Sequence, residues 1–199
     1  MTSRTPTDHP VHELISRRWS PRAFSDALLE HEQLLSIFEA ARWAASSKNE
    51  QPWSFVVATR DDAQGFQQLF GCLMPGNQGW AGQAATLVLA VAETRREDGT
   101  TNRYAMHDTA LAVSNLILQA TSMGFHAHQM GGFDREAASA EVGLPDTHDP
   151  VSMIAIGRAA GPDTLPEDLR ERELQPRTRR PLNEFVYGPA WGEVSGLVR

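Results

Sequence analysis

One stretch of the chain, from Tyr104 to about Met123, carries apolar residues on nearly every side at helical spacing. These residues are Ala110, Leu111, Val113, Leu116, Ile117, Leu118 and Ala120. A helix with so little polar surface is buried on most sides. In a chain of 199 residues, we therefore expect this helix to be central to the domain or to lie in a subunit interface.

Shorter periodic segments around this helix indicate the fold class. They predict helices at residues 11–18, 31–44, 61–70 and 135–142, and strands at residues 53–58, 86–92, 126–129 and 151–157. Residues 74–82, which are rich in glycine, are predicted to form a loop. Because helices and strands are interspersed without regular alternation, the sequence predicts a single α+β domain over residues 1–199.

The two ends of the chain differ from its middle. Residues 1–10 are predicted to be a mobile arm. Residues 161–199 contain five prolines and no strong periodicity. A tail of this length without a core of its own is best explained if it wraps over a partner subunit.

Composition excludes several classes of protein. The formal net charge of -7 disfavours a nucleic-acid partner. Cys72 is the only cysteine, so there is no internal disulfide framework. The longest apolar run, residues 84–92, is too short to span a membrane, and the N-terminus lacks the apolar segment of a secretory signal. We expect a cytoplasmic protein with no membrane partner.

The arginines gather near both ends of the chain. One cluster comprises Arg17, Arg18 and Arg22, and the other comprises Arg170, Arg172, Arg177, Arg179 and Arg180. The planar guanidinium fork suits phosphate or carboxylate, so the clusters favour a small anionic ligand. The alternative is surface ion pairing, because acidic residues lie beside the second cluster.

Four short segments contain the candidate binding groups. In the first, Arg18, Ser20 and Arg22 alternate in an extended piece around Pro21, which places three side chains suited to a phosphate on one side. The second, residues 45–53, offers hydroxyl and amide groups after a helix. The third, residues 130–134, has two glycines that let a backbone approach a ligand closely. The fourth, residues 177–182, again alternates arginines. A solvated basic strand and ordinary turns are the alternative interpretations.

Taken together, in this order and spacing, the four segments resemble the nitroreductase family of flavin-dependent oxidoreductases. The Asn-x-Gln-Pro-Trp stretch at residues 49–53 and the final Trp191-Gly192 are similar to the family's signatures. The resemblance implies a central, mainly antiparallel sheet flanked by helices. It also implies a homodimer with interlocking extensions and one FMN at each of two interface sites.

The resemblance assigns candidate FMN contacts residue by residue. Arg18 and Ser20 match positions that bind the phosphate and the ribityl chain, and Arg177 and Arg179 match the cations that close around the phosphate. Arg22 matches a cation near flavin N1 and O2. Asn77 matches an amide that contacts the polar edge of the ring. Ala45, Ser46, Ser47 and Asn49 match positions that reach FMN from the other subunit. Gly131 and Gly132 match the turn whose backbone faces flavin N5. Trp80 stands where some members have lysine, and Gly131 where some have glutamate.

The activity implied by the resemblance is a ping-pong hydride transfer. NADH or NADPH would reduce the flavin at N5, and a nitroaromatic, quinone or related electrophilic acceptor would reoxidise it. Arg22 would stabilise the negative charge on reduced flavin. The alternatives are a member dedicated to one dehydrogenation or to flavin breakdown, a non-catalytic FMN-storage protein, and a phosphate-ester-binding module without flavin.

Other candidate sites are weaker. His126 and His128 could place two imidazoles on one side of a strand, but no third ligand has suitable spacing, so we expect no metal. The His107-Asp108 pair indicates the start of a helix rather than a catalytic pair. Cys72 has no nearby histidine in the sequence to activate it as a nucleophile.

Overall fold

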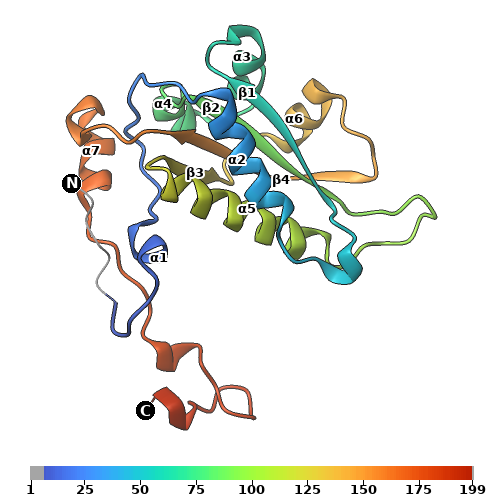
Figure 1. Ribbon diagram of the computed structural model, residues 1–199, viewed down its shortest axis with the longest axis vertical. Helices are drawn as coiled ribbons and strands as arrows, with labels where there is room; N and C mark the ends of the chain where they lie inside the picture. The colour runs from blue at the N-terminus through green and yellow to red at the C-terminus, as the bar shows by residue number, and fades with distance from the viewer. Residues whose placement is uncertain (1–6, 199) are drawn as a thin grey trace.

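A four-stranded antiparallel sheet forms the centre of the protein, whose computed structural model describes residues 7–198 (Figure 1). Its strands are β1 (Trp53–Thr59), β2 (Thr86–Glu93), β3 (His126–Met130) and β4 (His148–Gly157), in the order β1-β2-β4-β3. All three neighbouring pairs run antiparallel. The prediction of an α+β fold with an antiparallel sheet is confirmed.

Helices cover both faces of the sheet (Figure 1). One face carries α2 (His31–Arg42) and α5 (Ala105–Ser122), and the other carries α3 (Ala63–Gly71), α4 (Pro75–Ala81) and α6 (Arg135–Val142). Alternate residues of β2 supply the two cores: Leu87 and Leu89 face the second group of helices, whereas Val88 and Ala90 face α2 and α5. A strand buried on both faces is apolar throughout, as the sequence of β2 is.

Helix α5 is central, but only one of its sides is buried. Ala112, Val113 and Leu116 pack against the sheet and α2. Met106 and Leu111 lie on the opposite side and are 45% and 37% exposed. The predicted burial is therefore confirmed for the sheet-facing side, while the other side leaves apolar surface uncovered in a single chain.

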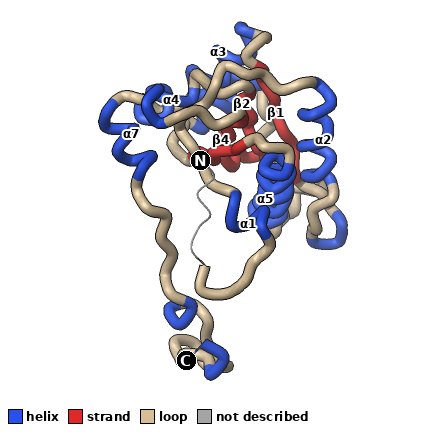
Figure 2. Tube along the Cα trace, turned by 60° about the vertical axis from the view of Figure 1, so that its left-hand side comes forward, coloured by secondary structure: helices blue, strands red, loops and turns tan. Residues whose placement is uncertain are grey.

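Two sequence predictions about irregular segments are wrong. Residues 75–81, expected to be a loop, form α4, because Pro75 fits the first helical turn and Trp80 and Ala81 pack into the core. The tail is not extended from residue 161, because α7 (Glu167–Leu174) packs on the domain through buried Leu169. From residue 175 the chain leaves the domain, with short 3-10 turns near its end (Figure 2).

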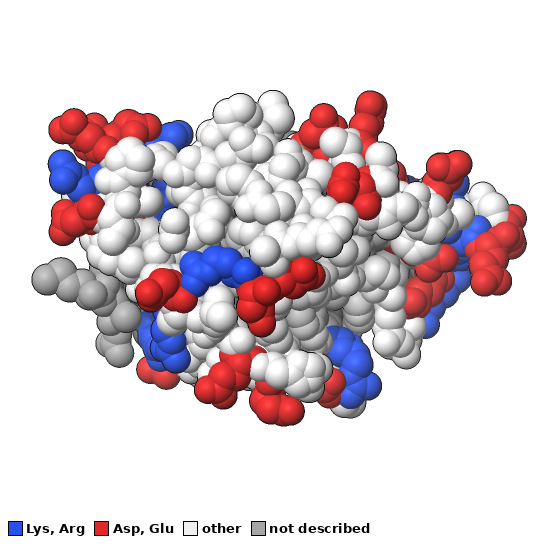
Figure 3. Space-filling view, turned by 90° about the horizontal axis from the view of Figure 1, so that it is seen from above, with Lys and Arg blue, Asp and Glu red and all other residues white. Residues whose placement is uncertain are grey.

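The remaining short elements are α1 (Glu13–Arg17) and the 3-10 turns η1 (Ser47–Asn49), η2 (Pro162–Thr164), η3 (Leu182–Glu184) and η4 (Gly196–Val198). Thr7–Pro10, part of the predicted arm, is exposed and has no helix or strand, and residues 1–6 lie outside the described part. Among residues 7–198, no helix is both long and apolar enough to cross a membrane. Acidic and basic side chains lie intermixed at both ends and across the lower middle of the view in Figure 3, and its upper middle is largely uncharged.

Candidate functional site

The segment from Arg18 to Arg22 runs beside the edge strand β3. The Trp19 ring packs edge-on against His126, with centroids 5.8 Å apart, and the Pro21 carbonyl lies 2.9 Å from His128 Nδ1. His126 and His128 share one face of β3, so alternate residues of the segment contact the strand. Arg18, Ser20 and Arg22 line a cleft together, and Trp19 also borders it.

This cleft brings the two ends of the chain together. Its volume is about 220 Å³, and its lining is Arg18, Trp19, Ser20, Arg22, Arg172, Glu173, Gln175, Arg177 and Arg179. Arg18 and Arg179 also border a second cleft of about 540 Å³ between α1 and the tail. Burial lowers the pKa of the Arg18 guanidinium, and the positive charges of Arg177 and Arg179 lower it further. Such a concentration of like charge is stabilised by binding an anion.

Hydrogen bonds to main-chain carbonyls hold Arg177 in place. Its Nη1 donates to the Arg18 carbonyl at 2.7 Å, and its Nη2 donates to the Ser16 carbonyl at 3.2 Å. Arg18 Nη1 in turn donates to Ser20 Oγ at 3.2 Å. The tail thus fixes the backbone of the segment that carries Arg18.

Arg22 differs from the other cleft arginines because it pairs with Glu173 of α7. Its Nη1 lies 3.7 Å from Glu173 Oε2, and the buried Glu173 carboxylate also accepts hydrogen bonds from the Arg22 and Ala23 amides. The surface ion pairing considered for the second arginine cluster is found at Arg170, whose Nη1 lies 4.0 Å from Asp163 Oδ1. The charge of Arg22 is partly balanced within the chain, which the sequence did not reveal.

Both β3 histidines are neutral near pH 7. Burial lowers the pKa of His126 and of His128 to about 4. The His128 ring also packs on Trp80, with centroids 4.4 Å apart. Trp80 is buried and stacks on Phe24, with ring centroids 6.2 Å apart, so it belongs to the core. Among residues 7–198, no group of three or more His, Cys, Asp or Glu side chains could hold a metal ion.

A second candidate region joins the end of β3 to α4. Asn77 Nδ2 donates to the Gly132 carbonyl at 2.9 Å, and the Met74 amide donates to the same oxygen at 3.0 Å. A Cβ at Gly132 would lie 2.9 Å from Asn77 Nδ2, whereas a Cβ at Gly131 would meet no atom within 4 Å. A side chain at Gly132 would therefore displace the Asn77 amide, whereas the backbone at Gly131 has open space beside it.

The third region is the turn from Ser46 to Gln51, which includes η1. Lys48, Asn49 and Gln51 have φ of 53°, 58° and 50°, in the left-handed region that side chains other than glycine rarely adopt. Each such residue costs on the order of 1–3 kcal/mol and persists only where its surroundings enforce it. The Gln51 amide donates to Ser46 Oγ at 3.1 Å, which closes the turn.

A buried carboxylate on α5 holds this turn. The Ser47 amide donates to Asp108 Oδ2 at 2.8 Å, and His107 Nδ1 lies 2.8 Å from Asp108 Oδ1. Asp108 lies in the first turn of α5, so the expectation of a helix start is confirmed. Its second role is to hold Ser47, which lies 61 positions away and gives no local sequence signal for the contact.

The turn lies at one end of α5, and α1 with the chain that follows it lies at the other (Figure 1). That chain carries Arg18, Ser20 and Arg22 of the arginine cleft. The helix has 18 residues, so its ends are about 27 Å apart at ~1.5 Å per residue. One chain brings Arg18, Ser20, Arg22, Arg177 and Arg179 together, and separately Asn77 with Gly132. It does not bring Ala45, Ser46, Ser47 or Asn49 to the arginines.

Comparisons with known proteins identify the family of this chain. The model of the nitroreductase family matches residues 15–158. A solved structure described as an oxidoreductase containing FMN superposes with a TM-score of 0.90 at 34% identity, over 95% of this chain and 96% of the other. A nitroreductase family protein from Clostridium difficile superposes with a TM-score of 0.70 at 25% identity, over 89% and 96% of the two chains.

Comparison of sequences identifies further relatives. A 15.4 kDa protein of Mycolicibacterium smegmatis without a characterised activity is 35% identical over 145 residues, 69% of this chain and 97% of that protein. A relative from Archaeoglobus fulgidus, named as an NADH dehydrogenase/NAD(P)H nitroreductase, is 25% identical over 73% of this chain and 83% of its own length. The chain therefore belongs to the nitroreductase family of oxidoreductases.

Proposed function

We propose that this protein binds FMN and uses it to pass a hydride from NADH or NADPH to a nitroaromatic, quinone or related electrophilic acceptor. The observation that carries the proposal is the meeting of Arg18, Arg177 and Arg179 around one cleft. They come from distant parts of the sequence, and a phosphate monoester is the group that such a cluster suits best.

The residues present fit FMN at both of its ends. The arginine cleft suits the phosphate, with Ser20 Oγ as a further polar group beside Arg18. The open backbone of Gly131, with Asn77 and Gly132 beside it, suits the polar edge of a flat ring, because the space around Gly131 allows close approach. When bound, FMN supplies the hydride-accepting and hydride-donating chemistry that side chains lack.

The chain's own residues position the cofactor and balance its charge. Arg18, Arg177 and Arg179 would neutralise the phosphate, and the Arg177 contacts with Ser16 and Arg18 would keep the segment in place. The pairing of Arg22 with Glu173 orients its guanidinium at the cleft and reduces the net positive charge it can offer near flavin N1 and O2.

We further propose that the site is completed in a homodimer. The turn at residues 46–51 lies too far from the arginine cleft to share a small ligand with it in one chain. Met106 and Leu111 on α5 expose apolar surface, and Trp191 in the tail is 93% exposed. A second copy that packs on α5, with its tail wrapped around the first, would cover these residues and bring its turn to the cleft.

The test uses the purified protein. We expect a yellow protein whose released cofactor is FMN, bleached by NADH or NADPH and reoxidised by menadione or nitrofurazone. A colourless protein that binds a phosphate ester but no flavin would contradict FMN binding. A yellow protein that NAD(P)H does not bleach would indicate storage rather than catalysis.

A further inference from the structure

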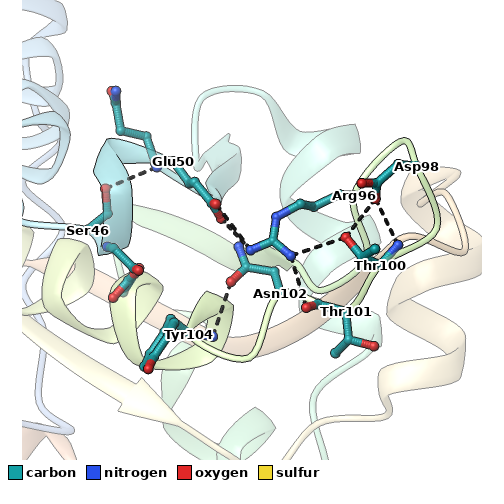
Figure 4. A network of polar contacts seen from close by, with 11 residues as sticks. Ser46, Glu50, Arg96, Asp98, Thr100, Thr101, Asn102 and Tyr104 are labelled. Carbon is teal, nitrogen blue, oxygen red and sulfur yellow. Dashed lines mark hydrogen bonds and ion pairs between the residues drawn. The ribbon is translucent and has the colours of Figure 1, made fainter.

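The turn at residues 46–51 forms an ion pair with a segment that has no assigned role in FMN binding. This segment is the loop at residues 94–102 that joins β2 to α5, which we call the 94–102 loop (Figure 4). Arg96 Nη2 donates to both carboxylate oxygens of Glu50, at 2.8 and 3.1 Å. Both side chains are half-buried, 35% and 26% exposed, which strengthens the pair relative to one in open solvent.

The 94–102 loop is rigid enough to act as an anchor. Arg96 N donates to the Thr100 carbonyl at 2.9 Å, and Gly99 closes the loop with φ of 81°. Asp98 Oδ1 accepts hydrogen bonds from the amide and the hydroxyl of Thr100. At its base, Asn102 N donates to the Thr94 carbonyl at 2.8 Å, and Asn102 itself is buried.

The orientation of Arg96 is set by this loop as well as by Glu50. Its Nη1 donates to the Thr101 carbonyl at 3.0 Å, so the guanidinium bridges the loop and the turn (Figure 4). The hydrogen bond to Glu50 raises the pKa of Arg96 above its ordinary value. The guanidinium is thus held by the loop in a position that fits the Glu50 carboxylate.

Glu50 lies between two residues with positive φ, Asn49 and Gln51. A strained turn returns to ordinary dihedrals unless its surroundings enforce the strain. Asp108 fixes one end of this turn through Ser47, and Glu50 is the side chain by which its other end is fixed.

We propose that Arg96 is a positioning residue that holds the 46–51 turn in its left-handed conformation and thereby presents Ser46, Ser47 and Asn49 to FMN. This inference rests on the proposed function. In this proposal the 94–102 loop orders the 46–51 turn, which is the part of the site away from the arginine cleft.

The first measurement is hydrogen–deuterium exchange of the turn in the protein without FMN. In Arg96→Met we expect peptides covering residues 44–52 to exchange about threefold to tenfold faster, as for loss of a half-buried ion pair. Arg95→Met is the matched control, because Arg95 in the same loop donates to the Asp146 carbonyl instead. The control should leave exchange in residues 44–52 unchanged.

The second measurement is the dissociation constant for FMN. We expect it to rise about threefold to tenfold in Arg96→Met and to be largely restored in the charge-swapped Glu50→Arg/Arg96→Glu protein. Unchanged exchange and affinity in Arg96→Met would overturn the proposal. Faster exchange with unchanged affinity would also overturn it, because the turn would then not serve the cofactor. A wild-type protein that binds no FMN would instead overturn the proposed function, and this inference with it.

Discussion

The arginine cleft and the 46–51 turn are held in opposite ways. The cleft concentrates positive charge, and main-chain carbonyls at Ser16, Arg18 and Pro21 fix its parts. The turn carries strained dihedrals, and the carboxylates of Asp108 and Glu50 fix it. The difference teaches that the cleft would supply binding energy, whereas the turn would supply shape.

The largest effect on FMN binding should come from removing positive charge from the cleft, which tests whether the cleft supplies the binding energy. Arg18→Ala or Arg179→Ala should weaken FMN binding by roughly 1.5–3 kcal/mol, about tenfold to 150-fold, because each loses a charge-assisted contact to phosphate. Isothermal titration calorimetry measures the change.

Arg170→Ala is the control, because Arg170 pairs with Asp163 and is absent from the cleft lining. FMN affinities equal to wild type in both cleft variants would contradict the assignment of the phosphate site.

Gly132→Val tests the region that joins the end of β3 to α4. The new Cβ would lie 2.9 Å from Asn77 Nδ2 and displace the amide from the Gly132 carbonyl. We expect the free energy of unfolding to fall by about 1–3 kcal/mol from overpacking. FMN should still bind through its phosphate, but its reduction by NAD(P)H should slow.

Gly131→Ala is the matched control, because a Cβ there meets nothing within 4 Å. Urea unfolding and stopped-flow bleaching make the two measurements. Equal stability in Gly132→Val and Gly131→Ala would show that the contact with Asn77 does not constrain this site.

Lowering the pH should destabilise the segment that forms the cleft before it destabilises the 46–51 turn. The pKa of His126 and of His128 is lowered to about 4 from an ordinary 6.5, so the unfolded chain binds these protons first. Stability from these groups is complete above about pH 7 and is lost as the pH falls through about 6.5 toward about 4. Hydrogen exchange of residues 16–24 should accelerate across this window ahead of residues 44–52.

The double variant His126→Gln/His128→Gln checks this origin. It should flatten the pH dependence of the free energy of unfolding, while His31→Gln, an exposed histidine at the start of α2, should not. An unchanged pH slope in the double variant would assign the acid sensitivity to other groups.

The smallest effect concerns strain in the turn. Lys48→Gly should raise the free energy of unfolding by at most about 1 kcal/mol. Glycine relieves the strain because it adopts a positive φ freely, but its greater entropy in the unfolded chain offsets part of that gain. Asn49→Gly should gain less, because asparagine tolerates this region better. Equal destabilisation by both, measured by urea unfolding, would show that the turn is not strained.

The fold was largely predictable because its elements carry local patterns. Helix α5 and strand β2 are apolar runs bounded by turn residues, and both were found within a few residues of their ends. Helix α4 was missed because its two internal glycines, Gly76 and Gly79, lower helix propensity, whereas burial of Trp80 outweighs that cost.

The site was predictable only in part. Arg18, Ser20 and Arg22 were expected to lie together because period-two geometry is local, and they line one cleft with Trp19. The contacts of Glu173 with Arg22, Asp108 with Ser47 and Arg96 with Glu50 join residues 46 or more positions apart. No local pattern encodes such pairings.

The most direct test of the account is FMN occupancy in mixed pairs of two defective chains. One chain carries Arg18→Ala/Arg179→Ala in the cleft, and the other carries Asn49→Leu in the turn. If cleft and turn meet across two chains, each variant alone should bind little FMN, and a purified mixed pair should regain one intact site. If a single chain forms the whole site, the mixed pair would remain without FMN, which would contradict the account.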